Sequence, residues 1–177
     1  MNKAIIVGVC LILFSCSSIP VGTMLKLSSL DGDSFLKLKS KELRTKIQID
    51  KPMEIDVTKT KLSLELETSK GNIIFNFPLN VVYVKDILPE ENWLTAIPER
   101  SEYELSLSEE AIKNFKNLQV KMKAEQPKRF SFNVDTDVEN NPMNQEAIIL
   151  SIFVRFSENS DYITLFDRAS VKIEDND

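Results

Sequence analysis

Apolar and polar residues alternate along most of this chain with a period of two, which is typical of half-buried β-strands. The clearest case is the segment 61–67, in which Leu62, Leu64 and Leu66 share one face. Runs of this kind recur between turn-forming residues, and they predict strands at 21–27, 43–49, 61–67, 73–77, 81–87, 103–107, 130–134, 148–156, 162–166 and 170–173. Many short strands with turns between them predict an all-β fold, either an antiparallel sandwich or a barrel. Because the spacing of the strands is irregular, we expect an antiparallel β-sandwich that is immunoglobulin-like or similar.

Two details of this pattern refine the expected sheet. The segment 148–156 is the most apolar of the runs, so we expect a central strand that is buried on both faces. Pro78 follows the run 73–77, and we expect it to end that strand because proline donates no backbone hydrogen bond.

One segment has the helical period instead. Ser108 suits the N-cap position, and Glu109 and Glu110 follow it in the first turn, where the helix dipole favours anions. Apolar residues then recur at helical spacing, at Ile112, Phe115, Leu118 and Met122. This pattern predicts one α-helix around 109–123. We expect its apolar stripe to pack on one end or edge of the sheets. The alternative is that the stripe docks in a groove of a partner protein.

The first sixteen residues follow a different pattern. Lys3 precedes an apolar run over residues 4–14, which has the layout of a secretory signal. The run is shorter than the roughly 20 residues that a membrane-spanning helix needs. Its end, Leu13-Phe14-Ser15-Cys16, resembles the lipobox of bacterial lipoproteins. An ordinary secretory signal and an uncleaved membrane anchor are the alternatives.

The lipoprotein resemblance implies how the chain is processed and where it resides. Residues 1–15 are removed as the signal peptide, Cys16 is acylated, residues 16–22 form a short tether, 23–174 form a single domain and 175–177 form an acidic tail. Serines rather than an aspartate follow the cysteine, which in that family favours the periplasmic face of the outer membrane. A lipid anchor in the cell membrane is the alternative. The mature domain resembles no family of known activity.

Composition narrows the chemistry further. The 177 residues carry a net charge of −5, which indicates solubility and argues against binding to nucleic acid. Histidine is absent, which excludes Ser-His-Asp and Cys-His nucleophiles and histidine-ligated metals. The two cysteines are Cys10 and Cys16, so the processed chain would contain no disulfide.

The segment 135–146 offers a candidate metal site. Asp135, Asp137, Glu139 and Glu146 resemble the oxygen ligands of an EF-hand calcium loop. The segment departs from that motif because it lacks the turn glycine and its flanks read as strands. An acidic connection between two strands is the alternative.

Two further patterns are candidate sites. Trp93 is a candidate partner contact, because exposed tryptophan is enriched in binding hot spots, and a tryptophan that packs beneath its own loop is the alternative. Glu90, Glu91 and Glu99 flank it, and paired carboxylates beside an aromatic ring loosely resemble a glycosidase site.

These features predict a membrane-anchored periplasmic lipoprotein without enzymatic activity, which binds an envelope protein as a structural or interaction component. The only group that we expect it to carry is the covalent lipid at Cys16, with calcium as the alternative. The alternative functions are a binding module for calcium, sugar or lipid, and a carboxylate-based hydrolase. Partner binding predicts a bare sheet edge or an exposed apolar patch, whereas a binding module predicts an enclosed apolar pocket.

Overall fold

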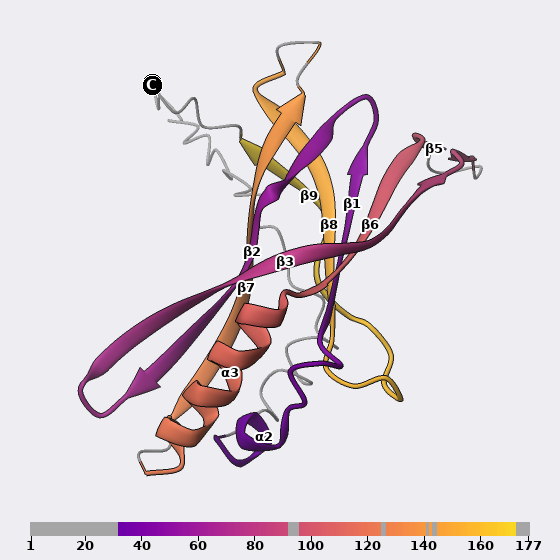
Figure 1. Ribbon diagram of the computed structural model, residues 1–177. Helices are drawn as coiled ribbons and strands as arrows, with labels where there is room; N and C mark the ends of the chain where they lie inside the picture. The colour runs from indigo at the N-terminus through magenta and orange to yellow at the C-terminus, as the bar shows by residue number, and fades with distance from the viewer. Residues whose placement is uncertain (1–31, 92–95, 125–126, 141, 143–144, 173–177) are drawn as a thin grey trace, which may run out of the picture.

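A computed structural model describes residues 32–91, 96–124, 127–140, 142 and 145–172 (Figure 1). The main elements, in chain order, are α2 (Gly32–Lys37), β1 (Arg44–Asp50), β2 (Glu54–Thr68), β3 (Gly71–Ile87), β4 (Glu90–Glu91), β5 (Ala96–Ile97), β6 (Arg100–Leu107), α3 (Glu109–Met122), β7 (Arg129–Asn140), β8 (Ala147–Arg155) and β9 (Ile163–Lys172). The strand predicted at 21–27 lies outside the described residues. The prediction of an all-β fold is confirmed.

Seven strands form one antiparallel sheet in the order β7-β2-β3-β6-β1-β8-β9. The long strand β3 is shared between two parts of this sheet, because its first half pairs with β2 and its second half pairs with β6. The sheet therefore folds into a three-stranded layer (β7, β2 and the first half of β3) and a five-stranded layer (the second half of β3, then β6, β1, β8 and β9), which is the expected sandwich arrangement.

The core lies between these layers and follows the alternation in the sequence. Leu62, Leu64 and Leu66 of β2 are buried, and so are Ile47 of β1 and Leu105 of β6. All five belong to one cluster of buried apolar side chains. Since apolar side chains from the two layers share this cluster, burial of their surface holds the layers together.

Helix α3 confirms the predicted helix and its cap. The hydroxyl of Ser108 accepts a hydrogen bond from the backbone N–H of Ala111, at 3.1 Å. Ala111, Phe115 and Leu118 are the buried residues of the helix. The Phe115 ring lies 5.2 Å from that of Phe77 on β3, so the apolar stripe packs on the sheet as expected.

Helix α2 was not predicted from the sequence. It packs beside α3 at one end of the sandwich (Figure 1). The side-chain amide of Gln119 on α3 donates to the backbone carbonyls of Phe35, at 2.9 Å, and Leu38, at 2.8 Å. The Phe35 ring is fully buried and lies 5.5 Å from the ring of Phe130 at the start of β7. Tertiary contacts therefore fix a helix that is too short to be stable by itself.

Three strand predictions were wrong in detail. Pro78 does not end a strand: the segments predicted at 73–77 and 81–87 are one strand, β3. The proline is tolerated because it is the last residue of β3 that pairs with β2, opposite Lys61, before β3 pairs with β6 from Leu79 onward. Its carbonyl accepts a hydrogen bond from the N–H of Ser108, at 3.1 Å.

The segments predicted at 162–166 and 170–173 are likewise one strand, β9, interrupted by a bulge. Arg168 lies in this bulge with φ 46°, and the hydroxyl of Ser151 on β8 accepts a hydrogen bond from its N–H at 2.9 Å. Strand β8, predicted to be central, is second from the edge, and Ile149 and Phe153 on its outer face are half-buried. Among the described residues, no helix has the length and apolar character needed to cross a membrane.

Candidate functional site

The two layers differ in width, with three strands in one and five in the other. The two ends of the wider layer differ in what they present at the surface. At one end, the inner face of β8 and β9 lines an open groove beside β7. At the other end, the second half of β3 exposes several valines. These two surfaces are the candidate binding sites of the described chain.

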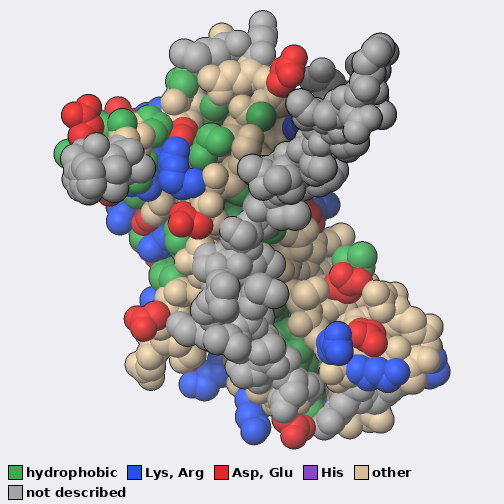
Figure 2. Space-filling view, turned by 180° about the vertical axis from the view of Figure 1, so that it is seen from behind, with side chains coloured by type: hydrophobic (Ala, Val, Ile, Leu, Met, Phe, Trp, Pro, Cys, Tyr) green, Lys and Arg blue, Asp and Glu red, His purple; other side chains and the backbone are tan. Residues whose placement is uncertain are grey.

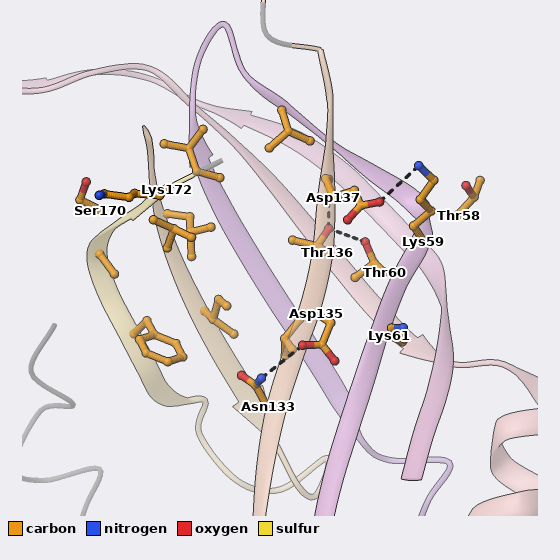
Figure 3. Close-up of a pocket in the computed structure, with 18 of the residues that line it drawn as sticks. Thr58, Lys59, Thr60, Lys61, Asn133, Asp135, Thr136, Asp137, Ser170 and Lys172 are labelled. Atoms are coloured by element: carbon orange, nitrogen blue, oxygen red, sulfur yellow. Dashed lines mark hydrogen bonds and ion pairs between the residues drawn. The ribbon is translucent and has the colours of Figure 1, made fainter. Parts of the chain in front are cut away.

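The groove has a volume of about 1010 Å³ and lies between β7 with β2 on one side and β8 with β9 on the other (Figure 3). Its floor is formed by alternate residues of β8, Ile148, Leu150 and Ile152, and therefore by one face of that strand. From β7, by contrast, the six consecutive residues 133–138 line it. Consecutive residues point to opposite faces of a strand, so the edge of β7 that pairs with no described strand borders the groove.

A bulge in β2 builds the polar rim of the groove. Pairing between β2 and β7 shifts between Asp56 and Lys61, so the residues between them stand out of the ladder. The carboxylate of Asp56 accepts hydrogen bonds from the N–H of Thr58, at 2.9 Å, and from the hydroxyl of the same residue. Both bonds lower the pKa of Asp56, and the bond from the hydroxyl contributes most. The hydroxyls of Thr60 and Thr136 lie 2.7 Å apart and tie the bulge to β7 (Figure 3).

Charges on this rim are paired across the strands. Lys59 Nζ lies 3.2 Å from Asp137 Oδ2, and the hydrogen bond to Asp137 is the main cause that raises the pKa of Lys59. Asp135 accepts hydrogen bonds from the Ser63 hydroxyl and, at 3.2 Å, from the side-chain amide of Asn133. The outer side of the groove is thus charged and hydrogen-bonded, while its inner side is apolar.

The second site, which we call the β3 surface, consists of Val81, Val82, Val84 and Leu88. Val81 and Val84 are opposite the buried Leu105 and Tyr103 of β6 in the ladder, yet they are 45% and 51% exposed. Val82 is 49% exposed at a bulge, and Leu88 is 76% exposed. The second half of β3 pairs with β6 at one edge, and no described strand pairs with its other edge.

Elsewhere the surface is charged with both signs. In Figure 2 the basic and acidic side chains are interspersed over the face that is shown. Such mixing keeps a protein soluble without a large field of one sign.

Three of the four acidic residues of the proposed calcium loop lie on a strand and not in a loop. Asp135, Asp137 and Glu139 belong to β7, which extends to Asn140, and Glu146 lies just before β8. In the described part of the chain, no three acidic or other metal-binding side chains are grouped closely enough to hold an ion. Calcium binding stays a prediction.

Of the other predicted site residues, Cys16 and Trp93 lie outside the described residues. Glu90 forms an ion pair with Arg100, and Glu99 lies 2.6 Å from Lys51 Nζ. These two carboxylates are engaged by cations.

Sequence reasoning missed both candidate surfaces. The run 81–87 has the apolar character of an ordinary strand, so only the fold shows that Val81, Val82 and Val84 are exposed. Comparison with known proteins gives no match, since no family model, curated protein or solved structure matches the chain.

Proposed function

We propose that this protein is a bacterial lipoprotein, anchored through acylated Cys16 at the periplasmic face of the outer membrane, that binds an envelope protein without catalysing a reaction. The lipobox-like segment Leu13-Phe14-Ser15-Cys16 supports the anchor. Several acyl chains hold a protein stably at a bilayer, because each buried methylene contributes about 0.8 kcal/mol.

The observation that carries the binding role is where the exposed apolar side chains lie. Of the eight large apolar residues that are exposed in the described chain, six lie on β3 or directly after it: Ile73, Ile74, Val81, Val82, Val84 and Leu88. Exposed apolar groups that gather on one element mark an interaction site more often than scattered ones do.

The partner that suits the β3 surface is an extended strand of another envelope protein. An edge strand presents a row of backbone N–H and C=O groups to which another strand can add. Val81 and Val84 would pack against side chains of the added strand. The strand of the partner should therefore carry apolar residues at the positions that face them.

Site-specific photocrosslinking in cells tests this proposal. A photoreactive residue at Val82 should give one discrete adduct, whereas the same residue at Val120 on α3, which is 65% exposed, should give none. The substitution Val84→Glu should abolish the adduct, while Val120→Glu should leave it unchanged. Equal crosslinking from positions 82 and 120, or an adduct that survives Val84→Glu, would contradict the role of the β3 surface.

A second candidate is a module for a small apolar ligand, which the apolar floor of the groove favours. Ile148, Leu150 and Ile152 would contact an acyl chain there. The test is titration with a fluorescent fatty acid. Saturable binding that Leu150→Asp removes would support this function, and the absence of saturable binding would dismiss it.

A further inference from the structure

The strand edge that borders the β3 surface continues beyond β3. Glu90 pairs with Ile97 in the same register as Ile87 with Arg100, so the hairpin of β3 and β6 runs on through β4 and β5. Among the described strands, β4 pairs with β5 alone. The edge that lacks a described neighbour therefore extends from the second half of β3 through β4, and this hairpin projects from the body of the sheet in Figure 1.

The charges along this edge indicate what kind of strand it accepts. We propose that the partner strand is cationic, with apolar residues opposite Val81 and Val84 and with lysine or arginine residues alongside Asp86 and β4. This inference rests on the proposed function, because it states the chemistry of the partner that the β3 surface binds.

Carboxylates gather at the β4 end of the edge. The side chains of Asp86, Glu90 and Glu99 are 60%, 55% and 43% exposed, and Glu91 is exposed as well. These residues come from the end of β3, from β4 and from the segment that joins β5 to β6. Because they lie on adjoining parts of one hairpin, their negative charges add at the place where a partner strand would pass.

Two cations offset part of this charge. Lys51 Nζ is shared by two of the carboxylates, at 2.9 and 2.6 Å, and Arg100 forms an ion pair with Glu90. Glu91 forms no ion pair with a cation of the described chain. Four carboxylates and two cations leave a formal charge of −2 at this end, and a basic partner would neutralise it.

The single cation of β3 does not cancel this negative charge. Lys85 Nζ lies 3.0 Å from the carboxylate of Glu102, whose side chain is only 3% exposed. The positive charge of Lys85 is therefore already matched by a buried negative charge within the sheet. It leaves the exposed carboxylates of the β4 end unbalanced.

Two more carboxylates act on the apolar part of the surface. Tyr103 lies opposite Val84, and burial is the main cause that raises its pKa. The negative charges of Glu54 and Glu139 raise the pKa of Tyr103 further, so both carboxylates lie in its surroundings. Both residues are exposed. The valines are thus approached through a region of negative potential, which attracts a cationic segment.

The alternation of β3 gives the order of residues in the partner. Val84 and Asp86 lie on the same face, because they are two residues apart in one strand. A strand with an apolar residue opposite Val84 therefore places its next residue on that face opposite Asp86, where a basic side chain is favoured. Every strand pair in this protein is antiparallel. In an antiparallel partner the basic residues precede the apolar ones.

Three synthetic peptides and the full-length protein test this preference. Each peptide alternates valine with threonine, and they differ only in two residues at the amino end, which are lysine, glutamine or glutamate. Fluorescence anisotropy should show that the lysine peptide binds most tightly, by about two- to fivefold over glutamine for each charge pair, and the glutamate peptide least tightly. The differences should shrink at high salt. Equal affinities would overturn the cationic preference and leave strand addition in place, whereas binding of no peptide would contradict strand addition itself.

Variants of the protein locate the effect. Glu91→Gln should weaken the lysine peptide about two- to fivefold and leave the glutamine peptide unchanged, because it removes one exposed charge. Asp161→Asn, exposed in the connection between β8 and β9, removes the same charge away from β3 and is the matched control. A lysine peptide that responds equally to both variants would sense only net charge and would overturn the proposal.

A change in the valines shows whether the peptides bind at the β3 surface. Val84→Ser should weaken all three peptides alike, because each loses the same apolar contact. Binding of the lysine peptide that is unaffected by Val84→Ser would place the peptide elsewhere and would overturn the proposal.

Discussion

Glu102 is a charged residue on the outer face of the five-stranded layer, yet its side chain is only 3% exposed. Its carboxylate accepts hydrogen bonds from the Gln48 amide at 2.6 Å and the Tyr83 hydroxyl at 3.1 Å. Lys85 and Lys46 lie at 3.0 and 3.6 Å. Burial acts to raise the pKa of Glu102, but these hydrogen bonds and cations outweigh it and hold the pKa below its ordinary value of 4.5.

A pKa that is lowered in the folded state makes stability depend on pH. The contribution of Glu102 to the free energy of unfolding is present above pH 4.5 and is lost as the pH falls through the lowered pKa. Glu102→Gln should therefore cost about 1–3 kcal/mol at pH 7, because its partners lose a charged acceptor in a buried place. Urea denaturation at a series of pH values measures this cost.

The exposed Glu91 on β4 offers the matched control for that experiment. Glu91→Gln should leave the urea midpoint unchanged at every pH, and the cost of Glu102→Gln should shrink toward acid pH. A cost for Glu102→Gln that is the same at pH 3 and pH 7 would contradict the pKa argument.

The sequence predicted which face of a strand a residue takes but not which residues meet across strands. Glu102 lies just before the predicted strand 103–107, and its alternation with Tyr103 and Leu105 is consistent with an outward side chain. Its contacts with Gln48 and Tyr83 depend on the order of β1, β6 and β3. That order is set by packing of the whole sheet, which no local pattern contains.

At the scale of elements, α3 was the easiest to predict because a cap, a charged first turn and a helical stripe all agree. Its N-cap also gives a clear test. Ser108→Ala removes the acceptor for the Ala111 N–H and should lower the free energy of unfolding by about 1 kcal/mol. Thermal denaturation followed by circular dichroism measures it.

The serine at position 131 provides a comparison, because it is exposed on β7. Ser131→Ala should change the melting temperature little, since it removes no cap. If both alanine variants melt alike, the hydroxyl of Ser108 contributes no capping stability.

The strands were harder to delimit for a physical reason. Pro78 and the segment 167–169 resemble strand ends, because one lacks an N–H and the other contains a bulge. A strand continues through both because hydrogen bonds from neighbours hold it there, from Ser108 to the Pro78 carbonyl and from Arg168 to Ser151. The sequence of α2 did not predict a helix, because its six residues are held in place by contacts with Gln119 and Phe130, which lie far away in the sequence.

At the scale of the molecule, the two candidate surfaces arise from unequal layers. The alternating pattern predicted the sandwich but not how many strands each layer contains. That number follows from the change of partner along β3. The exposed valines of β3 and the groove beside β7 could therefore not be predicted from the sequence. The lipobox-like segment, by contrast, is known from the sequence alone, since it lies outside the described residues.

The proposed anchor places these surfaces at a membrane, and it makes a distinct prediction about processing. Cys16→Ser should release the protein from membranes, because in this proposal the acyl chains provide the attachment. Cys10→Ser is the matched control and should leave membrane association intact, since residue 10 lies in the segment that we propose is removed. Fractionation of cells that express each variant measures the distribution.

Intact-mass spectrometry of the protein extracted from its native membranes tests the central claim most directly. We predict a chain that begins at Cys16, lacks residues 1–15 and carries a diacylglyceryl group on sulfur together with an acyl group on the new amine. A chain that retains residues 1–15, or one in which Cys16 bears no lipid, would contradict the account.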